Sequence, residues 1–290
     1  MTRTRADLIL LIAAVIWGLA FVAQSTAMAA VPPLVFIACR FILASLVLAP
    51  LAWWEHRRAR IPVDRKSLFG MIMLGIVFFT GAVLQQTALL TTSVTNTGFL
   101  TSLYVVFTPL IGLILHRQRP HVLIWLGIAL AMIGTWLLSG GVSNMRPGDF
   151  QLVLSALCWA GQVIMVGRLV RLTERAIGTV FMQMAVSATL GIIASLIFDH
   201  ANTGNIANAL PELLYTGIMS GGVAFALQAT GQRFTPNSDA AIILSAEAPF
   251  AAIFGALILG ERLTVAGGIG CGLIFSAILL VQLIPSERPS

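Results

Sequence analysis

Apolar stretches long enough to cross a membrane recur from one end of this chain to the other, and they restrict its fold more than any other feature. A helix needs roughly 20 apolar residues to cross a hydrocarbon core about 30 Å thick. Inside that core every backbone N–H and C=O group must be hydrogen-bonded within the protein, which a helix achieves locally. We therefore predict an all-α integral membrane protein with ten transmembrane helices, at residues 8–28, 33–53, 68–90, 95–115, 122–139, 150–168, 177–198, 211–231, 239–259 and 265–284.

The composition excludes a water-soluble domain. Apolar residues make up 58% of the 290 residues and charged residues only 10%. That leaves too few polar side chains to cover a surface exposed to water. Because the connections between the predicted helices are mostly short, we expect no separate soluble domain.

The basic residues mark one side of the membrane. Of the 17 Lys and Arg residues, fourteen flank the predicted helices on the side of the N-terminus, two lie on the other side, and Arg40 lies within a span. Because basic residues gather in cytoplasmic loops, we predict a multi-pass protein of the cell inner membrane with both termini in the cytoplasm. The charge of +6 is then explained by topology, and no nucleic-acid partner is expected. The fourteen are Arg3, Arg5, Arg57, Arg58, Arg60, Arg65, Lys66, Arg117, Arg119, Arg168, Arg171, Arg175, Arg233 and Arg288; the two are Arg146 and Arg262.

The residue types that perform catalysis or hold metals follow no functional pattern. Cys39, Cys158 and Cys271 fall within predicted helices without a CxxC pair, which predicts neither a disulfide framework nor a zinc site. The four histidines lack ligand spacing, and the sequence contains no HExxH, GxSxG or P-loop motif. We expect no catalytic residue, no metal site and no cofactor, so the chain is not predicted to be an enzyme.

The two halves of the chain resemble each other. When they are aligned, Trp17 matches Trp159 and Gln86 matches Gln228. Five helices in each half is an odd number, so the second half enters the membrane from the opposite side and the repeat is inverted. Many secondary transporters are built in this way, with a substrate site near the membrane midplane between the repeats. We assign the first repeat to residues 1–142 and the second to residues 143–290.

Two prolines are predicted to lie well inside spans. Pro109 and Pro249 align with each other when the halves are compared, and the other ten prolines are expected in loops or near helix ends. A proline inside a helix frees a backbone carbonyl group and bends the helix. A kink without function is the alternative for a single proline, but matching positions in the two repeats favour a pair of hinges.

Polar side chains within spans indicate where a cavity lies, because they are costly unless they face protein or water. Thr97, Thr101 and Tyr104 are spaced at i, i+4 and i+7, so they share one helix face. The alternative for each polar residue is a hydrogen bond to a neighbouring helix. The predicted substrate-binding residues are Trp17, Gln24, Gln85, Gln86, Thr97, Thr101, Tyr104, Trp159, Gln162, Gln228 and Glu247.

Two charged residues are predicted within spans. Glu247 lies nine residues beyond Ser238, which places it near the midplane at about 1.5 Å per residue. It either carries a proton, holds a substrate ammonium group, or is satisfied by water and by backbone groups that Pro249 frees. Arg40 is expected to be structural, by pairing or by reaching outward to the interface, with substrate binding as the alternative.

Several segments resemble the EamA family of the drug/metabolite transporter superfamily. They are "WGLAFV", "CRFILASLVL", "GFLTSLYVVFTPLIG" and "SAEAPFAAIFGALILGERLT", and they are spread over nearly the whole chain. The resemblance implies ten helices in two inverted five-helix repeats and a central cavity lined mainly by helices other than the fifth and tenth. It also implies export of metabolites, among which amino acids are prominent.

We therefore expect a secondary transporter that exports neutral amino acids, including aromatic ones, and related metabolites by alternating access. An exporter of drugs or other metabolites is the alternative within the family, and a non-transporting membrane enzyme or receptor is the alternative of another class. The expected partners are a small-molecule substrate and membrane lipid. Gly268 and Gly272 form a GxxxG pattern that permits close packing, either within a monomer or in a homodimer.

Overall fold

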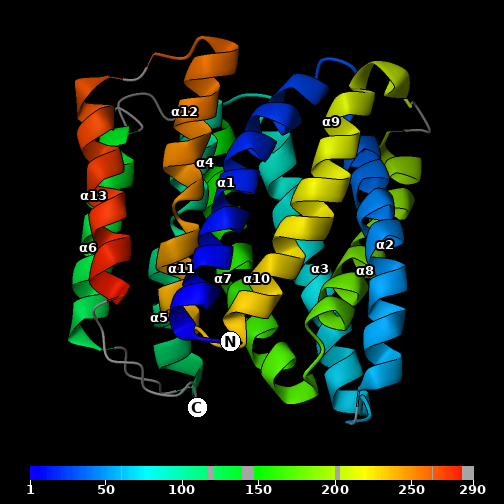
Figure 1. Cartoon of the computed structure of the whole chain (residues 1–290). Coiled ribbons are helices and arrows are strands. Elements are labelled where there is room, and N and C mark those ends of the chain that lie inside the picture. The colour runs from blue at the N-terminus through cyan, green and yellow to red at the C-terminus, as the bar shows by residue number, and fades with distance from the viewer. Residues whose placement is uncertain (60, 117–120, 139–146, 200–202, 263, 283–290) are drawn as a thin grey trace.

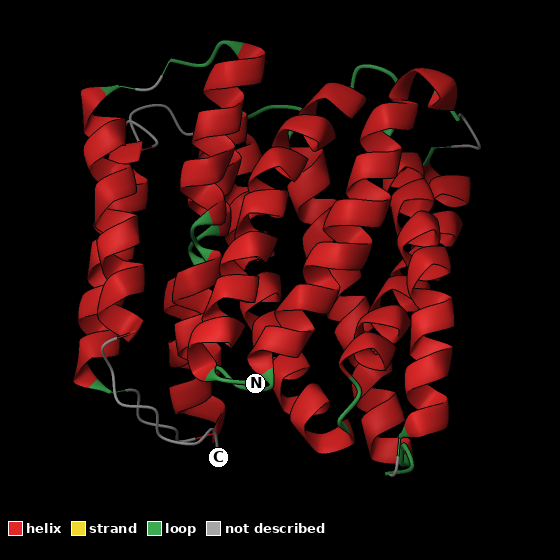
Figure 2. Ribbon diagram, viewed as in Figure 1, coloured by secondary structure: helices red, strands yellow, loops and turns green. Residues whose placement is uncertain are grey.

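The computed structural model describes residues 1–290 apart from 60, 117–120, 139–146, 200–202, 263 and 283–290. All regular elements of the described part are helices, and they form one bundle (Figures 1 and 2). Two predictions lie outside the described residues, namely the boundary between the repeats at residues 142–143 and the positions of five basic residues. Those five are Arg60, Arg117, Arg119, Arg146 and Arg288.

The prediction of ten membrane spans is confirmed. Eight segments of the described chain are helical, long and apolar enough to cross a membrane, and two shorter apolar helices complete the ten. The fold is an all-α membrane protein of two inverted five-helix repeats. The helices are α1 (Arg3–Ala27), α2 (Pro33–Arg58), α3 (Arg65–Ala88), α4 (Val94–Thr101), α5 (Tyr104–His116), α6 (Val122–Leu138), α7 (Pro147–Thr173), α8 (Ala176–Phe198), η1 (Ile206–Ala209), α9 (Leu210–Leu214), η2 (Tyr215–Ala224), α10 (Phe225–Gln232), α11 (Asn237–Leu244), α12 (Glu247–Leu259) and α13 (Val265–Gln282).

The fourth and ninth spans are each interrupted at the same point of the repeat. The fourth consists of α4 and α5, with a break at residues 102–103, and the ninth consists of α11 and α12, with a break at residues 245–246. A serine marks each break, because Ser102 Oγ donates to the Gly98 carbonyl at 2.7 Å and Ser245 Oγ to the Ile242 carbonyl at 2.6 Å. Such bonds compete with regular helix geometry.

The prolines lie after these breaks. Pro249 is the third residue of α12, and the carbonyl of Ser245, which it cannot bond, accepts from the Ala248 N–H at 3.1 Å. Pro109 lies further along, as the sixth residue of α5. The prediction that only these two prolines lie well inside a helix is wrong, because α2 continues beyond its predicted end at residue 53 and encloses Pro50.

Small residues let the helices approach closely. A Cβ atom at Gly18 of α1 would lie 2.4 Å from Cβ of Phe250 of α12, so the first and ninth spans cross almost backbone to backbone. At the edge of the bundle, α6 packs on α13, where a Cβ at Gly134 would lie 2.6 Å from the Gly270 carbonyl oxygen (Figure 1). The GxxxG glycines face away from this contact, since a Cβ at Gly268 would meet no described atom within 4 Å.

The eighth span departs from α-helical winding. Between α9 and α10, ten residues form the π-helical segment η2, whose hydrogen bonds reach five residues along the chain. The segment is rich in glycine, and a Cβ at Gly217 or Gly221 would lie 2.7 Å or 2.8 Å from the side chains of α2. Close packing on α2 therefore accompanies the wider winding.

The end of the bundle that holds the N-terminus is here called the N-terminal end (Figure 1). The described basic residues lie at helix ends on this side, except Arg40 within α2 and Arg262 beyond the end of α12. Arg175 bridges to the end of α2 there, with Nη1 2.7 Å from His56 Nδ1 and Nη2 donating to the Ile61 carbonyl at 2.7 Å. Asp64 caps α3 by accepting a bond from the Ser67 N–H at 2.9 Å. The Ser67 side chain and this backbone bond together lower the pKa of the Asp64 carboxyl group.

Candidate functional site

A cavity lies between the helices, and residues from both halves of the chain line it. It contains about 460 Å³ of space free of atoms, including the part open to solvent. Its polar lining comes from α1, α2, α3, α4 and α5 in the first half and from α7, η2, α10 and α12 in the second.

Nine of the eleven predicted substrate-binding residues line this cavity, and the structure thus brings them together. Gln86 instead donates to the Gln24 backbone carbonyl at 3.3 Å, because it lies one residue beyond Gln85 and so on another helix face. Thr97 lies one turn before Thr101, about 6 Å along the helix, and its hydroxyl donates to the Ser93 carbonyl at 2.9 Å. The nine are Trp17, Gln24, Gln85, Thr101, Tyr104, Trp159, Gln162, Gln228 and Glu247.

Six further residues line the cavity that the sequence did not single out as substrate-binding. Phe21 lies one turn after Trp17, and Leu244 ends α11 as Thr101 ends α4, so the two occupy matching ends of the interrupted spans. Helical spacing and repeat symmetry could have identified Phe21 and Leu244. The others are Arg40, Val163, Ser220 and Phe225.

Aromatic rings form one part of the lining. Phe225 lies between two indole rings, with its centroid 4.6 Å from that of Trp17 and 6.4 Å from that of Trp159. Behind them, Phe78 packs edge-on against Trp159 at 5.3 Å and against Phe225 at 4.9 Å. The two tryptophans, which match in the repeats, are therefore held in place by packing, and each presents a ring to the cavity.

The indole N–H groups are fixed by hydrogen bonds. Trp159 Nε1 donates to Gln85 Oε1 at 3.0 Å, and Trp17 Nε1 donates to the Ser220 carbonyl at 3.3 Å. Gln85 in turn donates through Nε2 to Gln24 Oε1 at 3.3 Å. One side of each indole is thus tied to a neighbouring helix, which leaves the ring faces as the contact surface.

The two glutamines of the second half that line the cavity bond to each other. Gln162 and Gln228 exchange two hydrogen bonds, each 3.1 Å from Nε2 to Oε1. Gln162 also lies 3.3 Å from Gln183 Oε1 on α8. These amides close the cavity wall by binding one another.

Arg40 enters the cavity wall instead of reaching outward to the interface, so that expectation is wrong. The residue is 5% exposed. Its Nη1 donates to Gln24 Oε1 at 2.8 Å and its Nη2 donates to Ser220 Oγ at 3.2 Å. These neutral acceptors hold the guanidinium inside the bundle, and no carboxylate of the described residues forms an ion pair with it.

Glu247 and Tyr104 occupy matching positions in the two repeats, since each is the first residue after the break in its span. The two side chains are neighbours in the cavity, where they are 5% and 4% exposed. Among the described residues, neither Tyr104 Oη nor Glu247 Oε1 has a hydrogen-bond partner, and the Thr101 hydroxyl has none either.

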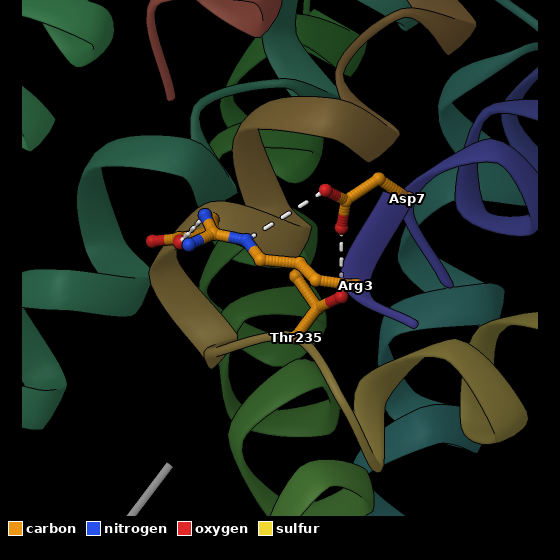
Figure 3. A network of polar contacts seen from close by, with 4 residues as sticks. Arg3, Asp7 and Thr235 are labelled. Atoms are coloured by element: carbon orange, nitrogen blue, oxygen red, sulfur yellow. Dashed lines mark hydrogen bonds and ion pairs between the residues drawn. The ribbon is translucent and has the colours of Figure 1, made fainter. Parts of the chain in front are cut away.

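Charged side chains close the N-terminal end of the bundle (Figure 3). Arg3 Nη2 lies 2.5 Å from Asp239 Oδ2, and Arg3 Nε lies 3.7 Å from Asp7 Oδ2. The Thr235 hydroxyl donates to Asp7 Oδ1 at 2.8 Å. At the opposite end, Thr95 donates to Glu261. Polar contacts therefore join the first half to the second at both ends.

The part of the chain that the structure describes holds no group of three or more His, Cys, Asp or Glu side chains arranged to bind a metal ion. The chemistry of the cavity consists of two indoles, paired amides, hydroxyls, one guanidinium group and one carboxyl group. Such a lining suits the binding of a small molecule.

Comparisons with known proteins match the whole arrangement. The sequence model of the EamA family, described as "EamA-like transporter family", matches this chain twice, at residues 4–140 and 146–283. An "Uncharacterized transporter" of Archaeoglobus fulgidus is 31% identical over 285 residues, covering 97% of this chain and 87% of that protein. "Uncharacterized transporter YwfM" of Bacillus subtilis is 26% identical over 97% of this chain and 95% of its own length. "Uncharacterized inner membrane transporter YicL" of Salmonella typhimurium is 24% identical over 99% of both chains.

One solved structure, titled only as the crystal structure of a protein, has a TM-score of 0.77 to this chain at 18% identity. The match covers 97% of this chain and 99% of that one. At this identity the likeness shows the fold alone.

Proposed function

Because the chain belongs to the EamA-like transporter family, we propose that this membrane transporter exports neutral amino acids, including aromatic ones, and related metabolites by alternating access. The observation that carries the proposal is the cavity between the two halves, which combines two indole faces with buried polar groups. Trp17 and Trp159 offer stacking surfaces to apolar and aromatic side chains. The polar groups recognise the part that all amino acids share.

Alternating access is supported by the way the halves meet. The cavity lies between inverted repeats, which is the usual place of the substrate site in such transporters. Arg3 and Asp239 join the halves at the N-terminal end, and Thr95 and Glu261 join them at the other end. Transport requires that one set of contacts opens while the other stays closed.

We further propose that the protein lies in the cell inner membrane with both termini in the cytoplasm. Apart from Arg40 and Arg262, the described basic residues lie at the N-terminal end, as the positive-inside rule expects for the cytoplasmic side. The name of one relative places that relative in an inner membrane. A small solute as cargo and the surrounding lipid are then the partners, with the monomer or a homodimer as the transporting unit.

The test is efflux from proteoliposomes loaded with labelled tryptophan, phenylalanine, methionine or threonine. We expect the wild type to release all four, and Trp159→Ala to release the aromatic ones about tenfold more slowly, since a lost aromatic contact of about 1 kcal/mol adds to lost apolar area. Trp125→Ala is the matched control, because Trp125 lies on α6 at 37% exposure and outside the cavity lining.

Two results contradict the proposal. If vesicles with wild-type protein retain all four amino acids as well as empty vesicles do, this cargo is wrong. If Trp159→Ala and Trp125→Ala release the amino acids at the wild-type rate, the cavity is not the transport site.

A further inference from the structure

Most of the neutral polar groups in the cavity are already used. Gln162 and Gln228 bind each other through two reciprocal hydrogen bonds. Gln24 Oε1 accepts from both Arg40 and Gln85. The amide side chains therefore have little capacity left for a substrate, and an occupant must be recognised by other groups.

Arg40 brings a charge into the cavity that its surroundings do not balance. The guanidinium has five N–H groups, and its two bonds to neighbouring helices go to the neutral acceptors Gln24 and Ser220. Its Nε has no partner among the described residues. Burying a cation without an anion costs several kcal/mol, so an anionic group bound at Arg40 would be strongly favoured.

Glu247 brings a buried carboxyl group for which the described residues supply no cation. No cationic side chain of the described residues forms an ion pair with it, Arg40 included. Its Oε1 is without a hydrogen-bond partner in that part of the chain, and the Tyr104 hydroxyl is the polar group that neighbours its carboxyl group. A cation carried by the occupant would provide the missing partner.

We propose that the cavity binds a zwitterion by its two charges, with Arg40 holding the carboxylate and Glu247 holding the ammonium group. The assignment rests on the proposed function and specifies how its cargo is recognised. One dipolar molecule provides a partner for both buried groups at once, whereas an amine or a carboxylic acid provides a partner for one and leaves the other. Tyr104 is a neighbour of Glu247, and Thr101 lines the same cavity, so their hydroxyls complete the hydrogen bonding at the ammonium end.

Arg40 and Glu247 belong to different halves of the molecule, on α2 and α12. A zwitterion held between them bridges the repeats, so occupancy and the relative position of the halves are linked. Arg40 and Glu247 are therefore specificity-determining residues for charge, while the indoles select for the side chain.

The experiment measures binding to purified protein by calorimetry with three probes of the same side chain. Phenylalanine carries both charges, phenethylamine lacks the carboxylate, and 3-phenylpropionate lacks the ammonium group. We expect the wild type to bind phenylalanine roughly 10- to 100-fold more tightly than either analogue, since a hydrogen bond to a charged group contributes about 1.5 to 3 kcal/mol.

Each of two variants, Arg40→Gln and Glu247→Gln, is expected to lose the preference for phenylalanine over one of the two analogues. Arg40→Gln should bind phenylalanine no better than phenethylamine, and Glu247→Gln should bind phenylalanine no better than 3-phenylpropionate. A general folding defect would weaken all three probes together, so the ratios separate recognition from stability. Arg40→Lys keeps the charge and should retain part of the wild-type preference.

Matched controls carry buried charges outside the cavity. Arg175 is 6% exposed and bonds His56, and Asp149 is 4% exposed and bonds Thr92. Arg175→Gln and Asp149→Asn should keep the wild-type order of the three probes. Neither residue belongs to the cavity lining.

The proposal is overturned if the wild type binds an analogue as tightly as phenylalanine, if it binds none of the probes, or if both cavity variants keep the wild-type ratios. Binding and transport are separate readouts here. If the wild type releases amino acids but the two cavity variants keep the wild-type ratios of probe affinities, this inference is wrong and the proposed function stands. If the variants show the expected ratios of probe affinities but the wild type releases no amino acid from vesicles, the binding site is supported and the proposed function is wrong.

Discussion

Arg3 Nη2 lies 2.5 Å from Asp239 Oδ2, which ties the first turn of α1 to the first turn of α11 across 236 residues of sequence. Asp7 lies one helical turn after Arg3 and shares the same guanidinium. Two carboxylates therefore depend on one cation at the N-terminal end, where the two halves of the molecule meet (Figure 3).

We predict that Arg3→Gln lowers the free energy of unfolding by about 2 kcal/mol. Removing one partner of a buried ion pair costs about 3 to 5 kcal/mol, and the figure is reduced here because the Arg3 side chain is 17% exposed. The loss leaves Asp7 and Asp239 near each other without their cation. Reversible unfolding in mixed micelles measures the change.

The double variant Arg3→Gln with Asp239→Asn tests whether the loss comes from this pair. It should regain part of the stability that Arg3→Gln loses, because one of the two stranded carboxylates is gone. Arg5→Gln is the control, since Arg5 is an exposed residue of the same first turn of α1. Equal losses from Arg3→Gln and Arg5→Gln would show that the ion pair does not stabilise the fold.

Tyr104→Phe should separate stability from transport. The Tyr104 hydroxyl neighbours Glu247 but forms no hydrogen bond of normal geometry with a described residue, so its removal should change the free energy of unfolding by less than about 1 kcal/mol. Amino-acid efflux should fall about fivefold, as expected for a lost hydrogen bond of about 1 kcal/mol to the cargo. Efflux from vesicles and unfolding in micelles are measured on the same preparation.

Thr108→Val is the matched control for that substitution. Thr108 is 1% exposed and its hydroxyl also lacks a partner in the described chain, but it does not line the cavity. Efflux by Thr108→Val should equal that of the wild type. Equal efflux by Tyr104→Phe and the wild type would exclude the Tyr104 hydroxyl from cargo binding.

Gly18→Ala and Gly268→Ala should change stability in opposite directions. A Cβ at Gly18 would lie 2.4 Å from Phe250 Cβ, whereas one at Gly268 would meet no described atom within 4 Å. Overpacking typically costs about 1 to 3 kcal/mol, and alanine favours a helix over glycine by about 1 kcal/mol. We expect Gly18→Ala to destabilise the protein and Gly268→Ala to stabilise it; stabilisation by both would mean that α1 and α12 do not cross so closely.

The orientation in the membrane is tested by cysteine labelling. In a background with Cys39, Cys158 and Cys271 replaced by alanine, Arg58→Cys should react with an impermeant thiol reagent only after the cells are permeabilised. Arg262→Cys, which is exposed near the opposite end, should react in intact cells. The reverse pattern would place the N-terminal end outside the cytoplasm.

The ten spans were predictable because hydropathy reflects the solvent that surrounds each helix. The ends of the helices were harder to predict, and α2 is the example, since it continues to Arg58. Its last turns carry Trp53 and Trp54, whose rings lie 4.1 Å and 4.0 Å from the Cζ atoms of Arg57 and Arg58. These pairs, spaced at i and i+4, continue the helix beyond the apolar stretch that the prediction used.

The cavity was predictable where polar spacing on one helix decides which side chains share a face. Which helices are neighbours is not encoded in that spacing, so the pairing of Gln162 with Gln228 could not be foreseen. Phe225 was missed because an apolar ring in a cavity and one in a core have the same pattern in the sequence.

The ten π-helical residues of η2 make the two halves unequal in shape. The sequence alignment that matches Gln86 with Gln228 also aligns residues 73–82 of the first half with this segment. Residues 73–82 belong to α3 and are α-helical. If the two repeats exchanged their conformations, the result would therefore not be the same structure rotated by a half turn about an axis in the membrane plane. In the proposed alternating-access cycle, the inward-open and outward-open forms are therefore expected to differ in energy, which gives the empty protein a preference for one side of the membrane.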